Sequence, residues 1–281
     1  MSRLPAWASA YLHHLGIAPR PASYAFLSEL CRAHLQAFPF ENVGKLLQAR
    51  RPGHKSLPSP EQFVADAVRC GFGGTCYAIH ANLLWLLREL GFSAHLVPVG
   101  TSHTAVIVRL PEWGGEPVYV DLGSTAPVYQ PVRFRRDPDN CIRFGPETVR
   151  ITPDAERPGR YQYLHYRGEK LVNEDWHFDP EERREPDDFA EAIDRSFAPG
   201  AFFLNCLRIH VYQWDSERSL SLKNNTLLIT HADGGERRLT LGSIRELEET
   251  VADEFRLPRL PVREAVEILQ SRGVDLFANE T

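Results

Sequence analysis

The segment GFGGTCY at residues 71–77 places Cys76 directly after two glycines and at the start of a helical pattern. The glycines permit an unusual backbone path into the first turn of that helix. Free N–H groups and the helix dipole in a first turn favour a thiolate, and backbone donors beside the sulfur could hold a developing oxyanion. This pattern is typical of a cysteine nucleophile. The alternative interpretation is a small buried hydrophobic residue after a flexible turn.

Two downstream residues have the chemistry of a base and of the group that orients it. His103 begins a strand-like stretch at 104–110, and Asp121 lies near the end of the next stretch, at 118–122. An antiparallel hairpin that aligns His103 with Asp121, turning at 110–114, puts both side chains on one face. Because a carboxylate in an apolar strand is costly unless paired, we predict a Cys76-His103-Asp121 triad. An exposed histidine and an edge-strand aspartate are the alternatives.

The elements that must position these residues follow a segregated order. Helical patterns cover much of the first ninety residues, at 22–38, from an N-cap at Ser59 to Cys70, and from Thr75 or Cys76 to Gly91. Strand-like patterns follow at 94–99, 104–110, 118–122, 202–214, 220–222, 227–230 and 238–241, and helices return from Ser243 and at 262–272. Segregation of helices and strands predicts an α+β fold rather than a doubly wound nucleotide-binding fold.

Composition narrows the functional class. The chain has 281 residues, 43% hydrophobic and 25% charged, which predicts about two ordinary globular domains. A net charge of -5 argues against binding to nucleic acid. Five scattered cysteines argue against a disulfide framework and favour a reducing, cytoplasmic location, and no apolar run is long enough to span a membrane. The histidines and cysteines show no metal-ligand spacing, so we expect no metal.

Several short motifs are spread along the chain. They are FPFENV at 38–43, GGTC at 73–76, SH at 102–103, VDLG at 120–123, and DF at 188–189 with SFAP at 196–199. Together these motifs resemble those of the arylamine N-acetyltransferases. The resemblance implies a helical bundle at 1–91 carrying the nucleophile, a central antiparallel β-barrel at 92–199 carrying His103 and Asp121, and a C-terminal α/β lid at 200–281.

The resemblance also implies a ping-pong reaction without a bound cofactor. Cys76 would take an acetyl or other short acyl group from a coenzyme A thioester, and an arylamine, hydrazine or other amine would then accept it. His103 would form the ion pair and transfer protons, and Asp121 would fix its tautomer. The alternatives are an amide synthase supplied by an acyl carrier protein, a Cys-His-Asp thiol hydrolase, and a non-catalytic binding module.

The sequence departs from the family pattern around this site. Phe72 stands where the family has an arginine that pairs with the residue corresponding to Glu41, so we expect His80 or Lys45 to pair with Glu41 instead. His80, where the family usually has asparagine, could equally be an ordinary helix position. Ser124 replaces an aromatic residue, and the loop before His103 is short. Candidates to line the acceptor pocket are Phe40, Phe72, Tyr77, Ser124 and Phe203, although such aromatic residues are more often core.

Overall fold

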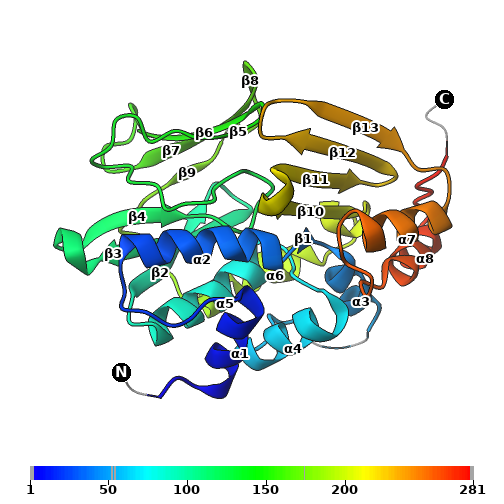
Figure 1. The fold of residues 1–281 in the computed structure, drawn as a ribbon, viewed down its shortest axis with the longest axis horizontal. Coiled ribbons are helices and arrows are strands. Elements are labelled where there is room, and N and C mark those ends of the chain that lie inside the picture. Colours follow the sequence, from blue (N-terminus) through cyan, green and yellow to red (C-terminus); the bar gives the residue numbers. More distant parts are fainter. Residues whose placement is uncertain (1–2, 52, 54, 174, 279–281) are drawn as a thin grey trace.

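The computed structural model describes residues 3–51, 53, 55–173 and 175–278. Helices dominate its first ninety residues and gather in the lower half of Figure 1. They are α1 (Ala6–Leu15), α2 (Tyr24–Ala37), α3 (Val43–Arg50), α4 (Pro60–Cys70) and α5 (Cys76–Glu89), with the short strand β1 (Phe40–Glu41) between α2 and α3. The expected α+β organisation and the three expected helices are present.

Local sequence explains where these helices begin and end. The Ser59 hydroxyl accepts a hydrogen bond from the Gln62 amide at the start of α4, and Gly71 ends that helix in the left-handed conformation. Helix α5 begins at Cys76, as predicted, and most of its residues are buried. Burial on almost every side fixes α5 in the core, and therefore fixes the position of its first residue.

The strands β2 (Ser93–Val99), β3 (His103–Leu110) and β4 (Glu116–Val120) form an antiparallel sheet that packs on α5. Val106 pairs with Val120, whereas alignment of His103 with Asp121 would pair Val106 with Val118. The predicted register is therefore wrong by two residues. The cause is the turn, where a short 3-10 helix at Pro111–Trp113 and two glycines with positive φ delay the return of the chain. A shift of two residues keeps both side chains on one face.

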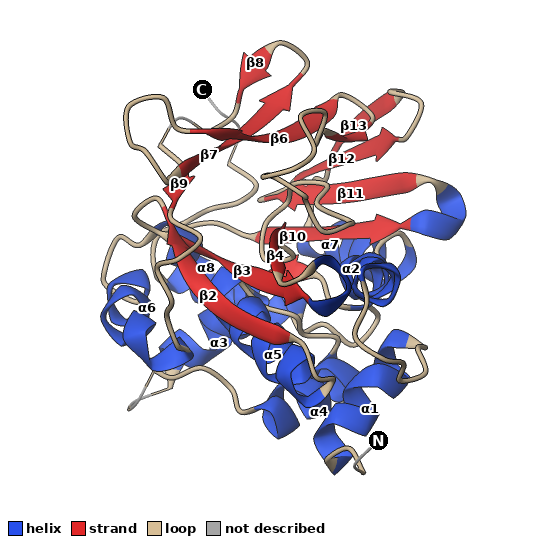
Figure 2. Ribbon diagram, turned by 90° about the vertical axis from the view of Figure 1, so that its left-hand side faces the viewer, coloured by secondary structure: helices blue, strands red, loops and turns tan. Residues whose placement is uncertain are grey.

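Two further antiparallel sheets lie above the helices (Figure 2). One contains β5 (Ile142–Phe144), β6 (Glu147–Pro153), β7 (Tyr161–Arg167), β8 (Lys170–Leu171) and β9 (His177–Phe178). The other contains β1 with β10 (Arg208–Gln213), β11 (Arg218–Lys223), β12 (Thr226–His231) and β13 (Glu236–Thr240). No sheet closes on itself within the described residues, so the central barrel is not confirmed.

The C-terminal region combines this last sheet with helices. They are α6 (Ala190–Ser196), α7 (Ile244–Asp253) and α8 (Val262–Ser271), and Ser243 caps α7 as predicted. Residues 202–214 do not form one strand, because Phe202–Leu204 forms a 3-10 helix and the strand begins at Arg208. Because β1 pairs with β10, the helical N-terminal region is joined directly to the C-terminal sheet.

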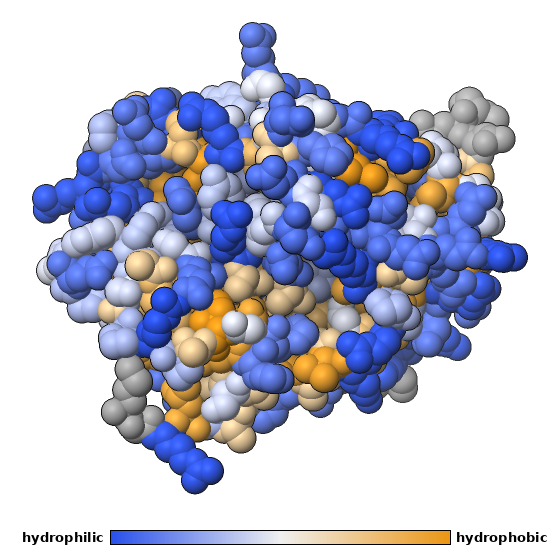
Figure 3. Space-filling model, in the orientation of Figure 1, coloured by the Kyte–Doolittle hydropathy of each residue, from blue (hydrophilic) through white to orange (hydrophobic). Residues whose placement is uncertain are grey.

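Two hydrophobic cores stabilise the molecule. The larger core joins the helices to β2–β4 and to the C-terminal sheet, and the smaller one lies between β2–β4 and β5–β9. The surface in Figure 3 is mostly hydrophilic, with apolar patches mainly over the helical half. Among the described residues, no helix has both the length and the apolar character needed to cross a bilayer.

Candidate active site

The loop before Cys76 is held against the segment that contains β1. A Cβ atom on Gly73 would lie 1.9 Å from the Pro39 carbonyl oxygen, so only glycine fits there. Gly74 has a φ of 132°, and its carbonyl accepts a hydrogen bond from the Glu41 amide at 3.0 Å. The two motifs at 38–43 and 73–76 therefore contact each other. Together they fix the entry of the chain into α5 and the position of Cys76.

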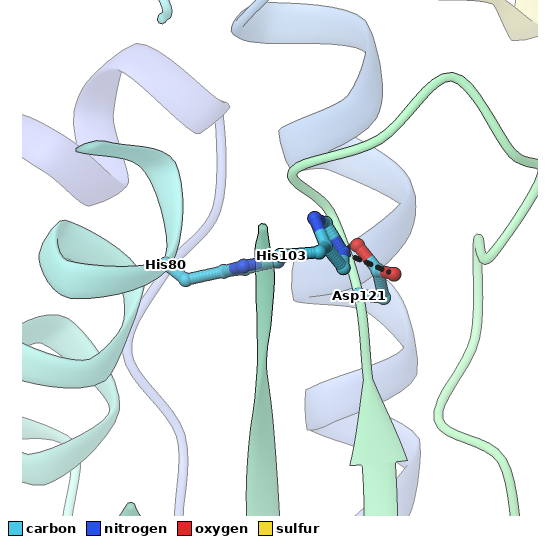
Figure 4. A group of neighbouring side chains, drawn as sticks. All are labelled: His80, His103 and Asp121. Carbon is cyan, nitrogen blue, oxygen red and sulfur yellow. Dashed lines mark hydrogen bonds and ion pairs between the residues drawn. The ribbon is translucent and has the colours of Figure 1, made fainter. Parts of the chain in front are cut away.

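The structure brings His103 and Asp121 into direct contact (Figure 4). His103 Nε2 and Asp121 Oδ2 are 2.9 Å apart, and both side chains are buried. Burial lowers the pKa of His103, but the charge and hydrogen bond of Asp121 outweigh this effect, and Cys76 adds to the rise. The resulting pKa is about 10. The geometry favours an imidazolium ion at neutral pH.

Cys76 lies beside this pair. Its side chain is 6% exposed, and its Sγ lies 3.9 Å from the Ser102 carbonyl oxygen, immediately before His103. A Cβ atom on Gly123 would lie 2.7 Å from the Cys76 Cα atom. The chain that follows Asp121 thus passes close to the backbone of Cys76, and a glycine permits that approach.

Asp121 has further hydrogen-bond donors. The Tyr119 hydroxyl donates to Oδ2 at 3.2 Å, and the Gly123 amide donates to Oδ1 at 3.2 Å. Burial raises the pKa of Asp121, but the charge and hydrogen bond of His103 outweigh burial, and the pKa of Asp121 falls below its ordinary value. The carboxylate is therefore ionised and held in one orientation.

His80 supports the turn that carries Asp121, which is not the position that we expected for it. Its Nε2 accepts the amides of Leu122 and Gly123, both at 2.9 Å, and lies 3.4 Å from Asp121 Oδ1. A ring nitrogen that accepts two N–H groups carries no proton. Burial also lowers the pKa of His80, which is consistent with a neutral ring. His80 therefore contacts the triad and does not pair with Glu41.

Glu41 is satisfied by backbone amides, which corrects our expectation of a cationic partner. One carboxylate oxygen accepts the Gly44 amide at 2.8 Å, and the other accepts the Gly73 amide at 3.2 Å. Lys45 instead donates to the Ser196 hydroxyl at 2.6 Å. Burial raises the pKa of Glu41 to about 7, although the backbone amides oppose the rise. Protonation of the Glu41 carboxyl group and the two backbone amide donors together take the place of the arginine partner.

Sequence reasoning missed Trp176, which stacks on His103. The two rings are 4.3 Å apart between centroids and 13° from parallel. A tryptophan face beside an imidazolium stabilises its positive charge. Trp176 precedes β9 and is distant in sequence from every motif, so no spacing signal could have identified it.

The predicted acceptor-pocket residues do not form one group. Phe40 and Phe203 contact each other with their ring centroids 5.7 Å apart, and the Ser124 hydroxyl accepts the Ala126 amide at 3.3 Å. Phe72 and Tyr77 line a cavity of about 410 Å³ beside the nucleophile loop. Tyr77 also lines a second cavity of about 250 Å³. Neither of these two cavities is lined by Phe40, Ser124 or Phe203.

The smaller cavity reaches His103. Its lining includes His103, Tyr77 and the short loop residues Gly100 and Thr101, together with charged side chains from residues 182–195. It is the cavity from which a small molecule could approach His103.

His80, His103 and Asp121 also offer three ligand atoms within 4.8 Å of one another. Each of these atoms already takes part in the hydrogen bonds described above, which a metal ion would have to displace. We therefore assign these residues to hydrogen bonding rather than to a metal.

Comparison with known proteins places the chain among the acyltransferases. A family model for N-acetyltransferases matches residues 24–262, and the chain belongs to this family.

Solved structures of arylamine N-acetyltransferases share the fold. The Salmonella typhimurium enzyme has a TM-score of 0.77 at 17% identity, with 96% of this chain and 100% of that chain covered. The Mycobacterium smegmatis enzyme has a TM-score of 0.75 at 21% identity, with 96% and 98% covered. The Mycobacterium marinum enzyme, in complex with CoA, has a TM-score of 0.71 at 19% identity, with 95% and 98% covered. No curated protein matches at the level of sequence.

Proposed function

We propose that the protein transfers a short acyl group from a coenzyme A thioester to an amine through a thioester on Cys76. The observation that carries the proposal is the buried hydrogen bond of 2.9 Å between His103 and Asp121, placed beside a cysteine in the first turn of α5. An imidazolium and a helix N-terminus both favour a thiolate. The sulfur is thus available as a nucleophile.

The first half-reaction forms the thioester and releases coenzyme A. The Cys76 thiolate attacks the carbonyl carbon of the donor thioester, and the bond from that carbon to the sulfur of coenzyme A breaks. His103 gives its proton to the departing thiolate and becomes neutral. Asp121 holds the ring through Nε2, so Nδ1 is the nitrogen that exchanges this proton.

The second half-reaction restores the enzyme. The amine nitrogen attacks the Cys76 thioester, the bond from carbon to Sγ breaks, and His103 accepts the proton that the nitrogen loses. Cys76 is again a thiolate and His103 again an imidazolium, so protons and electrons balance over the cycle. The Asp121 charge stabilises the imidazolium at both ends of the cycle.

We assign the donor by analogy with the relative whose structure contains CoA. This favours a coenzyme A thioester over an acyl carrier protein as the donor. The acceptor class is an amine, and the departures at Phe72 and Ser124 give no preference for an arylamine. No feature of the site favours water as the acceptor, so amide formation rather than hydrolysis is the proposed outcome.

Two-substrate kinetics with product analysis test the proposal. With acetyl-coenzyme A and a panel of aryl and alkyl amines, we expect parallel double-reciprocal plots and the N-acetyl amide as the product. Cys76→Ser should abolish turnover, and Cys70→Ser, which changes a half-buried cysteine outside the site, should not. Intersecting plots with the Cys76→Ser variant still active would overturn the covalent route, and free acetate as the main product would show a hydrolase.

A further inference from the structure

The cavity of about 410 Å³ is separate from the triad. It lies between α3, α4, α6 and the loop 72–75, and its lining does not include Cys76, His103 or Asp121. Tyr77 and helix α6 stand between it and the smaller cavity that reaches His103, since both contribute side chains to each. The volume is within the range of small-molecule sites.

Lys45 is the chemically unusual residue in this cavity. Its ammonium group donates to the Ser196 hydroxyl at 2.6 Å and lies 3.7 Å from the centroid of the Phe197 ring. Within the part of the chain that the structure describes, it forms no ion pair with a carboxylate. Burial lowers the pKa of Lys45 to about 8. A partly buried cation that is not paired with a carboxylate gains from binding an anion.

The rest of the lining provides apolar contact area. Phe63, Phe72 and Phe197 face the cavity together with Leu47 and Leu57. Phe72 is the residue that replaces the family's arginine, so an apolar ring lies where the resemblance implies a charge. A ligand that places an anionic head at Lys45 would lay its body against these side chains.

The acidic residues of the lining are already occupied. Asp66 accepts hydrogen bonds from Arg69 at 2.6 Å and from Gln62 at 2.7 Å. Glu41 accepts two backbone amides, as described above. Arg51 adds another cation to the lining. The lining groups that remain available to bind a ligand are therefore mainly cations.

We propose that this cavity binds a small amphipathic monoanion, a carboxylate or a phosphate monoester with an aromatic or short aliphatic body, with Lys45 as its counter-ion. The ligand would contact Gly74, Thr75 and Tyr77, next to the nucleophile. The site is distinct from the acyl-transfer site, and the inference does not depend on the proposed reaction.

Isothermal titration calorimetry of the full chain tests this proposal with 4-ethylbenzoate, phenyl phosphate and neutral 4-ethylbenzamide. We expect saturable 1:1 binding of at least one anion and at least about tenfold weaker binding of the amide. Lys45→Met, which keeps the apolar stem, should weaken anion binding at least about tenfold. Lys223→Met, on an exposed lysine at the end of β11, should not change it. The two anions distinguish a carboxylate from a phosphate ligand.

Two further measurements keep the test decisive. Leu57→Trp should block binding by filling the cavity while Lys45 is unchanged, which covers the case in which Lys45→Met does not fold. Protein alkylated at Cys76 by iodoacetamide should still bind, because Cys76 does not line the cavity. Any of three results would overturn the proposal. They are equal affinity of the parent and Lys45→Met for the anion, loss of anion binding after alkylation, and no saturable binding of either anion up to about 5 mM.

Discussion

Replacing Asp121 by asparagine is the most informative change at the triad. The substitution keeps the size of the side chain and removes the charge that His103 Nε2 contacts at 2.9 Å. An amide can also present its N–H₂ group to the ring, which selects the wrong tautomer of His103. We expect the imidazolium to be lost at neutral pH.

The size of the effect follows from the pKa of His103. Its rise from 6.5 to about 10 corresponds to about 5 kcal/mol in favour of the imidazolium. Burial alone lowers the pKa, so in Asp121→Asn the ring should be neutral at pH 7. Loss of the positioned acid and base should slow acyl transfer by about 10²–10⁴-fold.

Alkylation of Cys76 by iodoacetamide at pH 7 is the assay. In the parent, the reaction should be fast, because the imidazolium of His103 lies beside the sulfur. In Asp121→Asn, the second-order rate constant should fall at least about tenfold. Asp215→Asn, which removes the surface partner of Arg256, is the matched control and should resemble the parent.

An unchanged alkylation rate constant at pH 7 in folded Asp121→Asn would refute this reasoning. Circular dichroism of both variants would establish that the comparison is made between folded proteins. A parallel loss of reactivity in Asp215→Asn would also contradict it, because that residue lies at the surface.

Three other predictions follow from the site. His80→Ala should leave the Leu122 amide unsatisfied, at about 1–3 kcal/mol, and should leave the Gly123 amide with only its longer hydrogen bond to Asp121, so kcat should fall. His80→Asn should partly restore kcat because its carbonyl can accept these amides, and equal activity of the two variants would count against this. Gly123→Ala should lower both stability and activity, because the added Cβ atom would lie 2.7 Å from the Cys76 Cα atom. Urea unfolding and acyl-transfer assays measure the two effects, and a fully active, equally stable variant would contradict this. Glu41→Gln should flatten the pH dependence of the free energy of unfolding. The raised pKa of Glu41 lowers the stability of the parent by about 3 kcal/mol as the pH rises from 4.5 through 7. Urea unfolding measured over this pH range should show the difference, and the same pH dependence in parent and variant would argue against the buried acid.

Local patterns predicted the helices well because their boundary chemistry is short in range. Ser59 and Gly71 cap α4 as expected. Gly73, before Cys76, packs so closely on the Pro39 carbonyl that no residue with a side chain fits there. The contact between His103 and Asp121 was also predictable, because a carboxylate in an apolar strand needs a partner and a shift of two residues preserves the shared face.

Long-range contacts could not be predicted in the same way. Trp176 reaches His103 from another sheet, and no periodicity connects the two residues. Asn42 joins the N-terminal region to the C-terminal one by donating to the carbonyls of Phe203 and Cys206, both at 2.7 Å. Only the folded chain shows such pairs.

The error at Glu41 has a specific physical cause. We assumed that a buried carboxylate needs a cation, whereas two backbone amides and a raised pKa satisfy it. Backbone donors carry no signal in the identity of a side chain. His80, which we assigned to Glu41, was therefore free to accept the two amides beside Asp121.

Mass spectrometry of the intact protein, quenched seconds after mixing with acetyl-coenzyme A and without an amine, tests the central claim most directly. We predict a mass increase of one acetyl group, located on the peptide that contains Cys76 and lost when an amine is added. Continued amide formation by a protein that never carries an acetyl group on Cys76 would contradict it.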